Sequence, residues 1–233
     1  MANFNTHLSV AAAVSTASAL LTVDVHLMAY EDLPGLIFLG ILGGMLPDID
    51  ASNSKPVKLL FCVLAFMAVA AVLNALKDSY APYPLALVVV GTYLAIRHVL
   101  FALFNRLTVH RGVFHSVLAA SFFALLMVCI GDRLMHWDAL HAWANGSFIA
   151  LGFLVHLLLD ELFSVDLFNA RMKKSFGTAL KLFSYGNLSA SALMAICTAL
   201  LFWMAPTPAP LLKNLKAVHW HLNLAPYKLK TPR

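Results

Sequence analysis

Long apolar runs separated by short polar links repeat along the whole chain. A helix needs about 20 mostly apolar residues to cross a bilayer. Six runs come near this length, and they cover residues 6–22, 57–75, 84–104, 113–130, 147–163 and 190–205. A shorter run, 34–46, ends at Pro47. The pattern predicts an all-α fold, a polytopic membrane helix bundle of about seven helices.

Composition supports this prediction. Of the 233 residues, 61% are hydrophobic and 12% are charged, whereas an ordinary soluble domain has about 25% charged residues. A soluble protein with one very large core is therefore the weaker alternative. We expect one integral-membrane domain over residues 1–205 and a basic, Pro-rich tail over 206–233. The first six residues contain no lysine or arginine, so we expect the first helix to be retained rather than cleaved as a signal peptide.

The net charge of +5 comes from lysines and arginines scattered among the links, without the dense stripe typical of nucleic-acid binding. Three cysteines lie far apart inside apolar runs and suggest buried structural thiols. A basic, amphipathic segment, 164–189, is expected to lie along the membrane surface and attract anionic lipid headgroups. The expected partners are thus membrane lipids and the bilayer, with no nucleic acid. The oligomeric state is left open.

Polar residues with metal-binding side chains fall at one end of the predicted bundle. If each run crosses the membrane in turn, the same end receives all of them, and we call it the site end. They are His7, Asp48, Asp50, His110, His115, His156 and Asp160. Ionisable groups near hydrocarbon are costly and usually carry function, so their convergence predicts a single site.

His156 and Asp160 are four residues apart in a predicted helix, so their side chains share one face about 6 Å apart along the axis. This spacing suits two ligands of one cation. The alternative is a hydrogen bond between the two side chains within the helix.

His110 and His115 flank Arg111 and are separated by about 140° around a regular helix. If a helix begins near Gly112, His110 lies in the link before it and His115 lies in its first turn. The first-turn N–H groups and Arg111 would then face an anion. For either histidine alone, a structural role at the membrane interface is the alternative.

Asp48 and Asp50 follow a predicted helix end and have no basic neighbour before Lys55. One carboxylate could bind a metal while the other orients a histidine or helps to hold a second ion; a solvated turn is the alternative. Imidazole and carboxylate ligands without thiolate are expected for Zn, Mn or Fe in a hydrolytic site. The predicted cofactor is one or two divalent ions, with zinc favoured.

These motifs resemble the family of inner-membrane metal-dependent hydrolases that includes the LexA-regulated YdjM proteins. The resemblance runs through His7, the segment 46–50, the element 110–116 and the element 156–160. It implies hydrolytic, metal-dependent chemistry with a ligand pattern like that of the all-helical zinc phospholipases C.

From the residues and the resemblance together we expect hydrolysis of a phosphoester in a membrane lipid. Six residues are the expected metal ligands, namely His7, Asp48, His110, His115, His156 and Asp160. Asp50 is the expected proton acceptor or second carboxylate, and Arg111 the expected phosphate clamp. The alternatives are a metal-dependent lipid amide or ester hydrolase, and a non-catalytic metal transporter or membrane partner protein.

Orientation follows from the basic residues near the membrane. Most of them fall at the site end, namely Lys55, Lys58, Arg106, Arg111, Arg171, Lys173, Lys174 and Lys181. The links at the other end hold Lys77 and Arg133. Because cytoplasmic loops are enriched in lysine and arginine, we expect a multi-pass protein of the bacterial inner membrane with its site at the cytoplasmic face.

Overall fold

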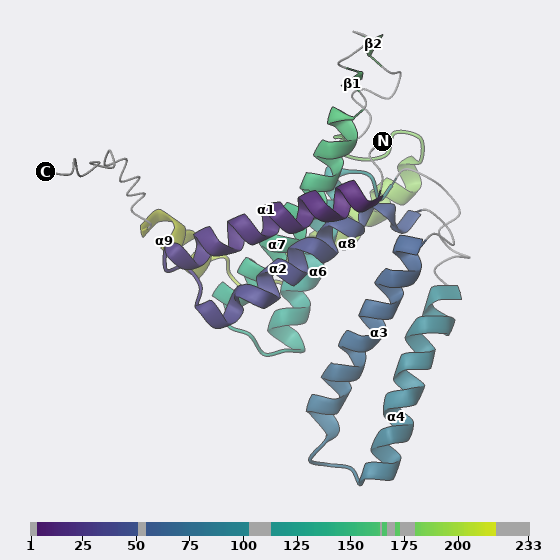
Figure 1. The fold of residues 1–233 in the computed structure, drawn as a ribbon. Coiled ribbons are helices and arrows are strands. Elements are labelled where there is room, and N and C mark those ends of the chain that lie inside the picture. Colours follow the sequence, from purple (N-terminus) through teal and green to yellow (C-terminus); the bar gives the residue numbers. More distant parts are fainter. Residues whose placement is uncertain are drawn as a thin grey trace, which may run out of the picture.

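The computed structural model describes residues 4–50, 55–102, 113–163, 165–166, 171–172 and 180–217. Side chains are described within these ranges except at 49–50, 55–57, 59–60, 63, 165–166 and 171–172. The described chain is almost entirely helical (Figure 1). Its α-helices are α1 (Phe4–Asp24), α2 (Leu33–Met45), α3 (Lys55–Leu76), α4 (Pro82–Leu94), α6 (Val117–Arg133), α7 (Ala139–Leu162), α8 (Leu188–Met204) and α9 (Ala209–Ala217).

Shorter elements join these helices. Two 3-10 turns, η1 (Tyr30–Asp32) and η2 (Pro47–Asp50), flank α2, and the π-helix η3 (Ala95–Leu100) continues α4. Two short antiparallel strands, β1 (Val165–Asp166) and β2 (Arg171–Met172), are the described part of the basic segment before residue 180. The predicted all-α bundle is therefore confirmed, and α9 adds a helix within the region predicted to be a tail.

Fewer helices qualify as membrane spans than the apolar runs predicted. Among the described residues, three are long and apolar enough to cross, and they are α1, Pro82–Leu100 and α7. A fourth exists if α8 and α9, which are bent by 77° to each other, count as one span. α6 and α8 contain 17 residues each, so each is only about 25 Å long. That is shorter than the hydrocarbon core of about 30 Å.

Small residues let α1, α2 and α7 approach closely. A Cβ atom added to Gly152 would collide with the carbonyl oxygen of Gly40, and one added to Gly44 would lie 2.6 Å from the Cβ of Ala11. Such contacts are typical of helices packed in a bilayer, where close approach replaces the hydrophobic driving force. Around them Leu36 and Phe153 are completely buried. This packing brings the start of α1 and the ends of α2 and α7 together.

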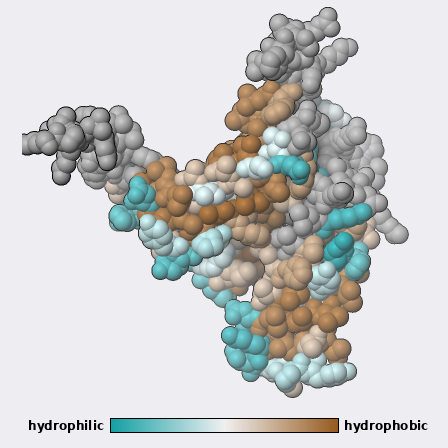
Figure 2. All heavy atoms as spheres, in the orientation of Figure 1, coloured by the Kyte–Doolittle hydropathy of each residue, from teal (hydrophilic) through white to brown (hydrophobic). Residues whose placement is uncertain are grey.

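The helices α3 and α4 form a hairpin that stands beside the bundle (Figure 1). The hairpin contacts the bundle mainly through η2, and α4 has no buried residue. Figure 2 shows a broad apolar surface over the hairpin, with polar side chains gathered toward its ends. Such a surface suits a lipid environment, so the hairpin is consistent with a membrane protein.

Candidate metal centre

His156 lies in the next-to-last turn of α7 and is completely buried. Its Nδ1 is 2.7 Å from the carbonyl oxygen of Gly44 on α2. Because a carbonyl can only accept, Nδ1 must carry the hydrogen and donate it. A backbone carbonyl bound to one ring nitrogen fixes the tautomer of a histidine and leaves the other nitrogen free to bind a metal. Nε2 is therefore the nitrogen of His156 that could bind a metal.

Two carboxylates face this nitrogen. Asp48 Oδ1 and Asp160 Oδ2 each lie 3.6 Å from His156 Nε2. Nε2 has no partner within hydrogen-bond distance among the described residues, but it forms an ion-pair contact with Asp160 within α7, so a direct His156–Asp160 pair stays the alternative to a metal site. Two carboxylates around one buried imidazole nitrogen need a cation to balance them, either a bound metal ion or the protonated ring. The arrangement therefore has the charge pattern of a cation site.

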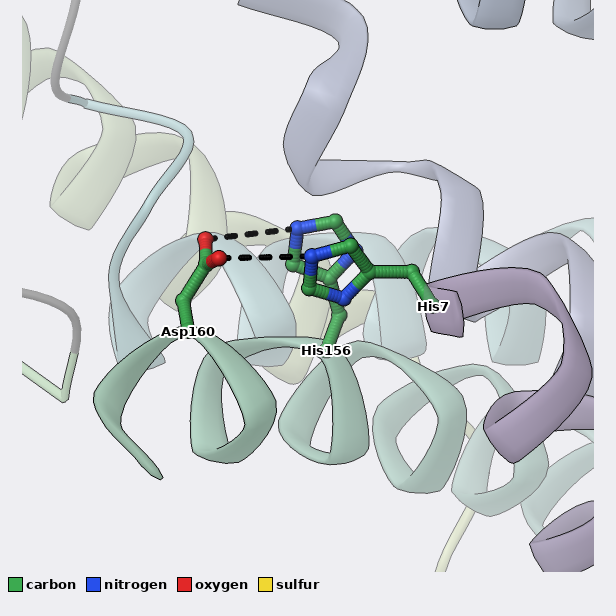
Figure 3. Close-up of side chains that lie close together, drawn as sticks. All are labelled: His7, His156 and Asp160. Atoms are coloured by element: carbon green, nitrogen blue, oxygen red, sulfur yellow. Dashed lines mark ion pairs between the residues drawn. The ribbon is translucent and has the colours of Figure 1, made fainter. Parts of the chain in front are cut away.

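His7, in the second turn of α1, completes the buried part of the cluster (Figure 3). Its ring stacks on the ring of His156, with centroids 3.7 Å apart and an angle of 12° between the planes. Its Nε2 lies 3.3 Å from Asp160 Oδ1. His7 and Asp160 are each 4% exposed. His7, near the start of the chain, is thus buried against the His156–Asp160 pair.

His115 approaches from the segment before α6. Its Nε2 lies 3.7 Å from Asp160 Oδ2, and its ring stands edge-on to that of His156 with centroids 5.8 Å apart. The prediction that the helix begins near Gly112 is wrong, because α6 begins at Val117 with Ser116 as its N-cap. His115 therefore reaches the cluster from the bend before α6 and not from a first helical turn.

The donor atoms have the spacing of ligands around one ion. Two sets of three can be drawn, one of His7, His156 and Asp160 and one of Asp48, His115 and His156. Within each set all donor atoms lie within 4.8 Å of one another. Two donors about 2.1 Å from a tetrahedral ion are about 3.4 Å apart. The nitrogen–oxygen distances of 3.3–3.7 Å are close to this value, while the stacked rings of His7 and His156 direct their Nε2 atoms at different oxygens of Asp160.

The first turn of α6 does not form the predicted anion site. The N–H groups of Val117 and Leu118 donate to the carbonyl oxygens of Lys181 and Leu182, each at 3.0 Å. The hydroxyl of Ser116 accepts a hydrogen bond from the N–H of Ala119, the third residue of the helix. These donors are the ones that an anion would use at a helix start. The expectation that these N–H groups face an anion is therefore wrong. The carbonyl oxygens of Lys181 and Leu182 occupy the positions that an anion would take.

Three predicted site residues are not placed. His110 and Arg111 lie outside the described residues, and Asp50 is described only through its backbone in η2. Their roles as metal ligand, phosphate clamp and proton acceptor stay predictions. Conversely, the carbonyl of Gly44 was not predicted, because a backbone acceptor leaves no mark on residue type. The Gly43–Gly44 pair just before Asp48 was the available signal.

A histidine–carboxylate group at the opposite end of the bundle shows a different arrangement. His141 Nδ1 lies 2.6 Å from Asp138 Oδ2, and its Nε2 lies 3.5 Å from Asp32 Oδ2. The backbone N–H of His141 also donates to Asp138 and holds the pKa of that carboxyl below its usual range. All three side chains are partly or largely exposed. The contact between His141 and Asp138 is therefore made by direct hydrogen bonds.

Comparison with known proteins adds one finding. A family model described as "YdjM inner membrane protein" matches residues 1–168. No match was found among curated proteins or among solved structures. The matched region includes every residue of the buried cluster, from His7 to Asp160. It also contains the three apolar helices that are long enough to span a membrane by themselves. The chain therefore belongs to the YdjM inner membrane protein family.

Proposed function

We propose that this protein is a metal-dependent hydrolase that cleaves a phosphoester of a membrane lipid. The observation that carries the proposal is the buried Nε2 of His156, which faces the carboxylates of Asp48 and Asp160. His156 also belongs to both sets of residues whose donor atoms lie close enough together to hold a metal ion.

Five residues would hold the ion, and they are His7, Asp48, His115, His156 and Asp160. Their imidazole and carboxylate donors favour zinc, with manganese or iron as alternatives. A divalent ion in such a site lowers the pKa of water and polarises a phosphoryl oxygen. His110, in the same segment as His115, is proposed as a further ligand.

Other groups act around the ion. The Gly44 carbonyl holds the ring of His156 in the orientation that directs Nε2 to the cluster. Asp50 is proposed to accept the proton of the attacking water. Arg111 is proposed to bind the phosphate, because a guanidinium donates two parallel hydrogen bonds to phosphate oxygens.

The position of the cluster favours a lipid substrate. His7 lies three residues after the start of α1, and Asp160 lies two residues before the end of α7. Both helices are candidate spans, so the cluster lies only about 5 Å inside their ends. This depth is where the headgroup and the first bonds of a lipid lie in a bilayer. From the distribution of basic residues we propose that this end faces the cytoplasm.

The experiment measures metal content and turnover of the full-length protein in lipid nanodiscs. A panel of phospholipids, lipid amides and lipid esters would be tested after zinc, manganese or iron is restored. We expect phosphoester cleavage that requires metal. Asp160→Asn should reduce turnover by at least about 100-fold, whereas Asp138→Asn at the opposite end should keep near wild-type turnover.

Three outcomes would contradict the proposal. Cleavage confined to lipid amides or esters would favour the other hydrolase. Metal binding without turnover of any lipid would favour a transporter or a non-catalytic protein. Equal turnover by wild type and Asp160→Asn would remove the cluster from the reaction.

A further inference from the structure

An apolar groove of about 600 Å³ opens between α6 and α8. Its walls include Val117 and Leu118 of α6, Leu182 and Phe183 of the connecting segment, and Ala192 and Ala195 of α8. The α8 wall follows residue 168, so part of the groove lies outside the region matched by the family model. None of the residues that line it belongs to the metal cluster described above.

The polar groups in the walls of the groove are already satisfied. The Ser121 hydroxyl donates to the carbonyl of Val117 at 3.1 Å, and the Ser191 hydroxyl donates to the carbonyl of Ser184 at 3.0 Å. The remaining lining is hydrocarbon or aromatic. A ligand of this groove therefore needs shape and apolar surface rather than hydrogen-bonding groups.

The groove begins next to the metal cluster. Val117 is two residues after His115, which limits the distance between their Cα atoms to about 7 Å. Hydrogen bonds from Val117 and Leu118 hold the segment 181–182 against the start of α6, where this segment forms one edge of the groove. One end of the groove thus lies next to the cluster, and its lining is apolar.

The hollow itself results from small residues on α8. Ala192 and Ala195 line the groove, whereas the neighbouring Leu193 and Ile196 do not and are 63% and 59% exposed. From Leu188 to Ala195 the helix contributes about 10 Å of groove length. An elongated apolar hollow that ends next to the cluster has a shape that suits one lipid tail with its headgroup at the cluster.

We propose that the groove binds one acyl chain of a phospholipid, with the headgroup directed to His115; this rests on the proposed function. Lipid tails are as apolar as leucine, so little hydrophobic energy favours the groove over the bilayer. The groove therefore acts by shape, holding one tail straight so that the phosphoester lies at the cluster. It would make the protein selective for lipids with a long, unbranched chain.

The first test is a binding measurement that needs no turnover. Full-length protein in nanodiscs is labelled with a phosphatidic acid that carries a diazirine in one acyl chain, and the labelled peptides are mapped. We expect labelling concentrated at Leu118, Ala192 and Ala195 and displaced by excess unlabelled phosphatidic acid. Ala192→Trp, which fills the groove, should reduce this labelling at least about tenfold. Leu193→Trp, one residue along the same helix, should leave it unchanged.

Labelling spread evenly over the exposed face of α8, including Leu193 and Ile196, would overturn the proposal, because bulk lipid would explain it. Absence of labelling in the groove would overturn it as well and would indicate that another protein segment covers this face. Neither result bears on metal-dependent turnover, which is measured separately.

The second test compares two phosphatidic acids with the same headgroup, one with 16-carbon chains and one with 4-carbon chains. Ala192→Trp should lower turnover of the long-chain lipid at least about tenfold while turnover of the short-chain lipid stays within about twofold of wild type. Leu193→Trp should change neither. An equal loss for both lipids would overturn the acyl-chain role, because the substitution would then act on the metal cluster rather than on the tail.

Discussion

The substitution Asp160→Asn should remove most of the stabilisation that a bound metal gives the protein. Every ion-pair partner that the described structure gives Asp160 is an imidazole, and its carboxylate is 4% exposed. A cation bound beside these imidazoles would therefore depend on the negative charge of this carboxylate. Asparagine has nearly the same shape, so packing is retained.

Metal should therefore stabilise wild type more than the variant. An ion present at about 100 times its dissociation constant stabilises wild type by about 2.7 kcal/mol. If loss of the charged ligand weakens binding about 100-fold, the same ion stabilises the variant by only about 0.4 kcal/mol. For a chain of this length 2.7 kcal/mol corresponds to roughly 5–10 °C in melting temperature. We therefore expect a large metal-dependent rise for wild type and almost none for the variant.

The assay is thermal unfolding at pH 8, followed by the fluorescence of the tryptophans, of which the sequence has four. Protein stripped by a chelator is compared with protein given back zinc. Asp138→Asn serves as the control, since that carboxylate lies at the other end of α7. A metal-dependent rise that is equal in wild type and Asp160→Asn would show that Asp160 does not help to hold the metal.

Further predictions concern three other positions. Ser116→Ala should destabilise the protein by about 1–3 kcal/mol in thermal unfolding, because the buried hydroxyl caps α6 and donates to the Val113 carbonyl at 2.7 Å; Ser116→Thr should recover part of this. Asp138→Asn should lower the melting temperature near neutral pH but not in acid: the folded pKa of Asp138 is depressed, so its stabilisation is present above about pH 4 and is lost as the pH falls further. Arg111→Ala should keep its metal but lose about 100-fold in turnover of an anionic phospholipid, with Arg111→Lys recovering only part; loss of metal in Arg111→Ala would contradict a role in substrate binding.

The positions of the helices could be predicted from the apolar runs, but their ends could not. The helix α6 begins after Ser116, a favoured N-cap residue, and not near Gly112 as the apolar run suggested. Among the described residues, fewer helices are long enough to cross a membrane than the apolar runs suggested, because apolar content alone does not say where a helix stops. α9 was missed because Pro206 and Pro208 make the region look irregular, although the chain beyond them returns to a helical pattern.

The cluster itself was predicted in part. The spacing of His156 and Asp160 and the alternation of crossings were enough to bring them together with His7, Asp48 and His115. The hydrogen bond of His156 Nδ1 could not be predicted, because its acceptor is a backbone carbonyl 112 residues away in the sequence. That contact depends on glycines that let α2 and α7 touch, which is a property of packing rather than of any one residue.

The central claim is that the buried cluster binds a divalent metal, and the most direct test is the metal content of the purified protein. Elemental analysis of wild type after zinc is restored and excess is removed should give close to one or two ions per chain. His156→Ala, provided that it remains folded, should have lost most of this metal, because His156 Nε2 is common to both sets of donors. A folded His156→Ala protein that retains wild-type metal content would show that the buried cluster does not bind the metal.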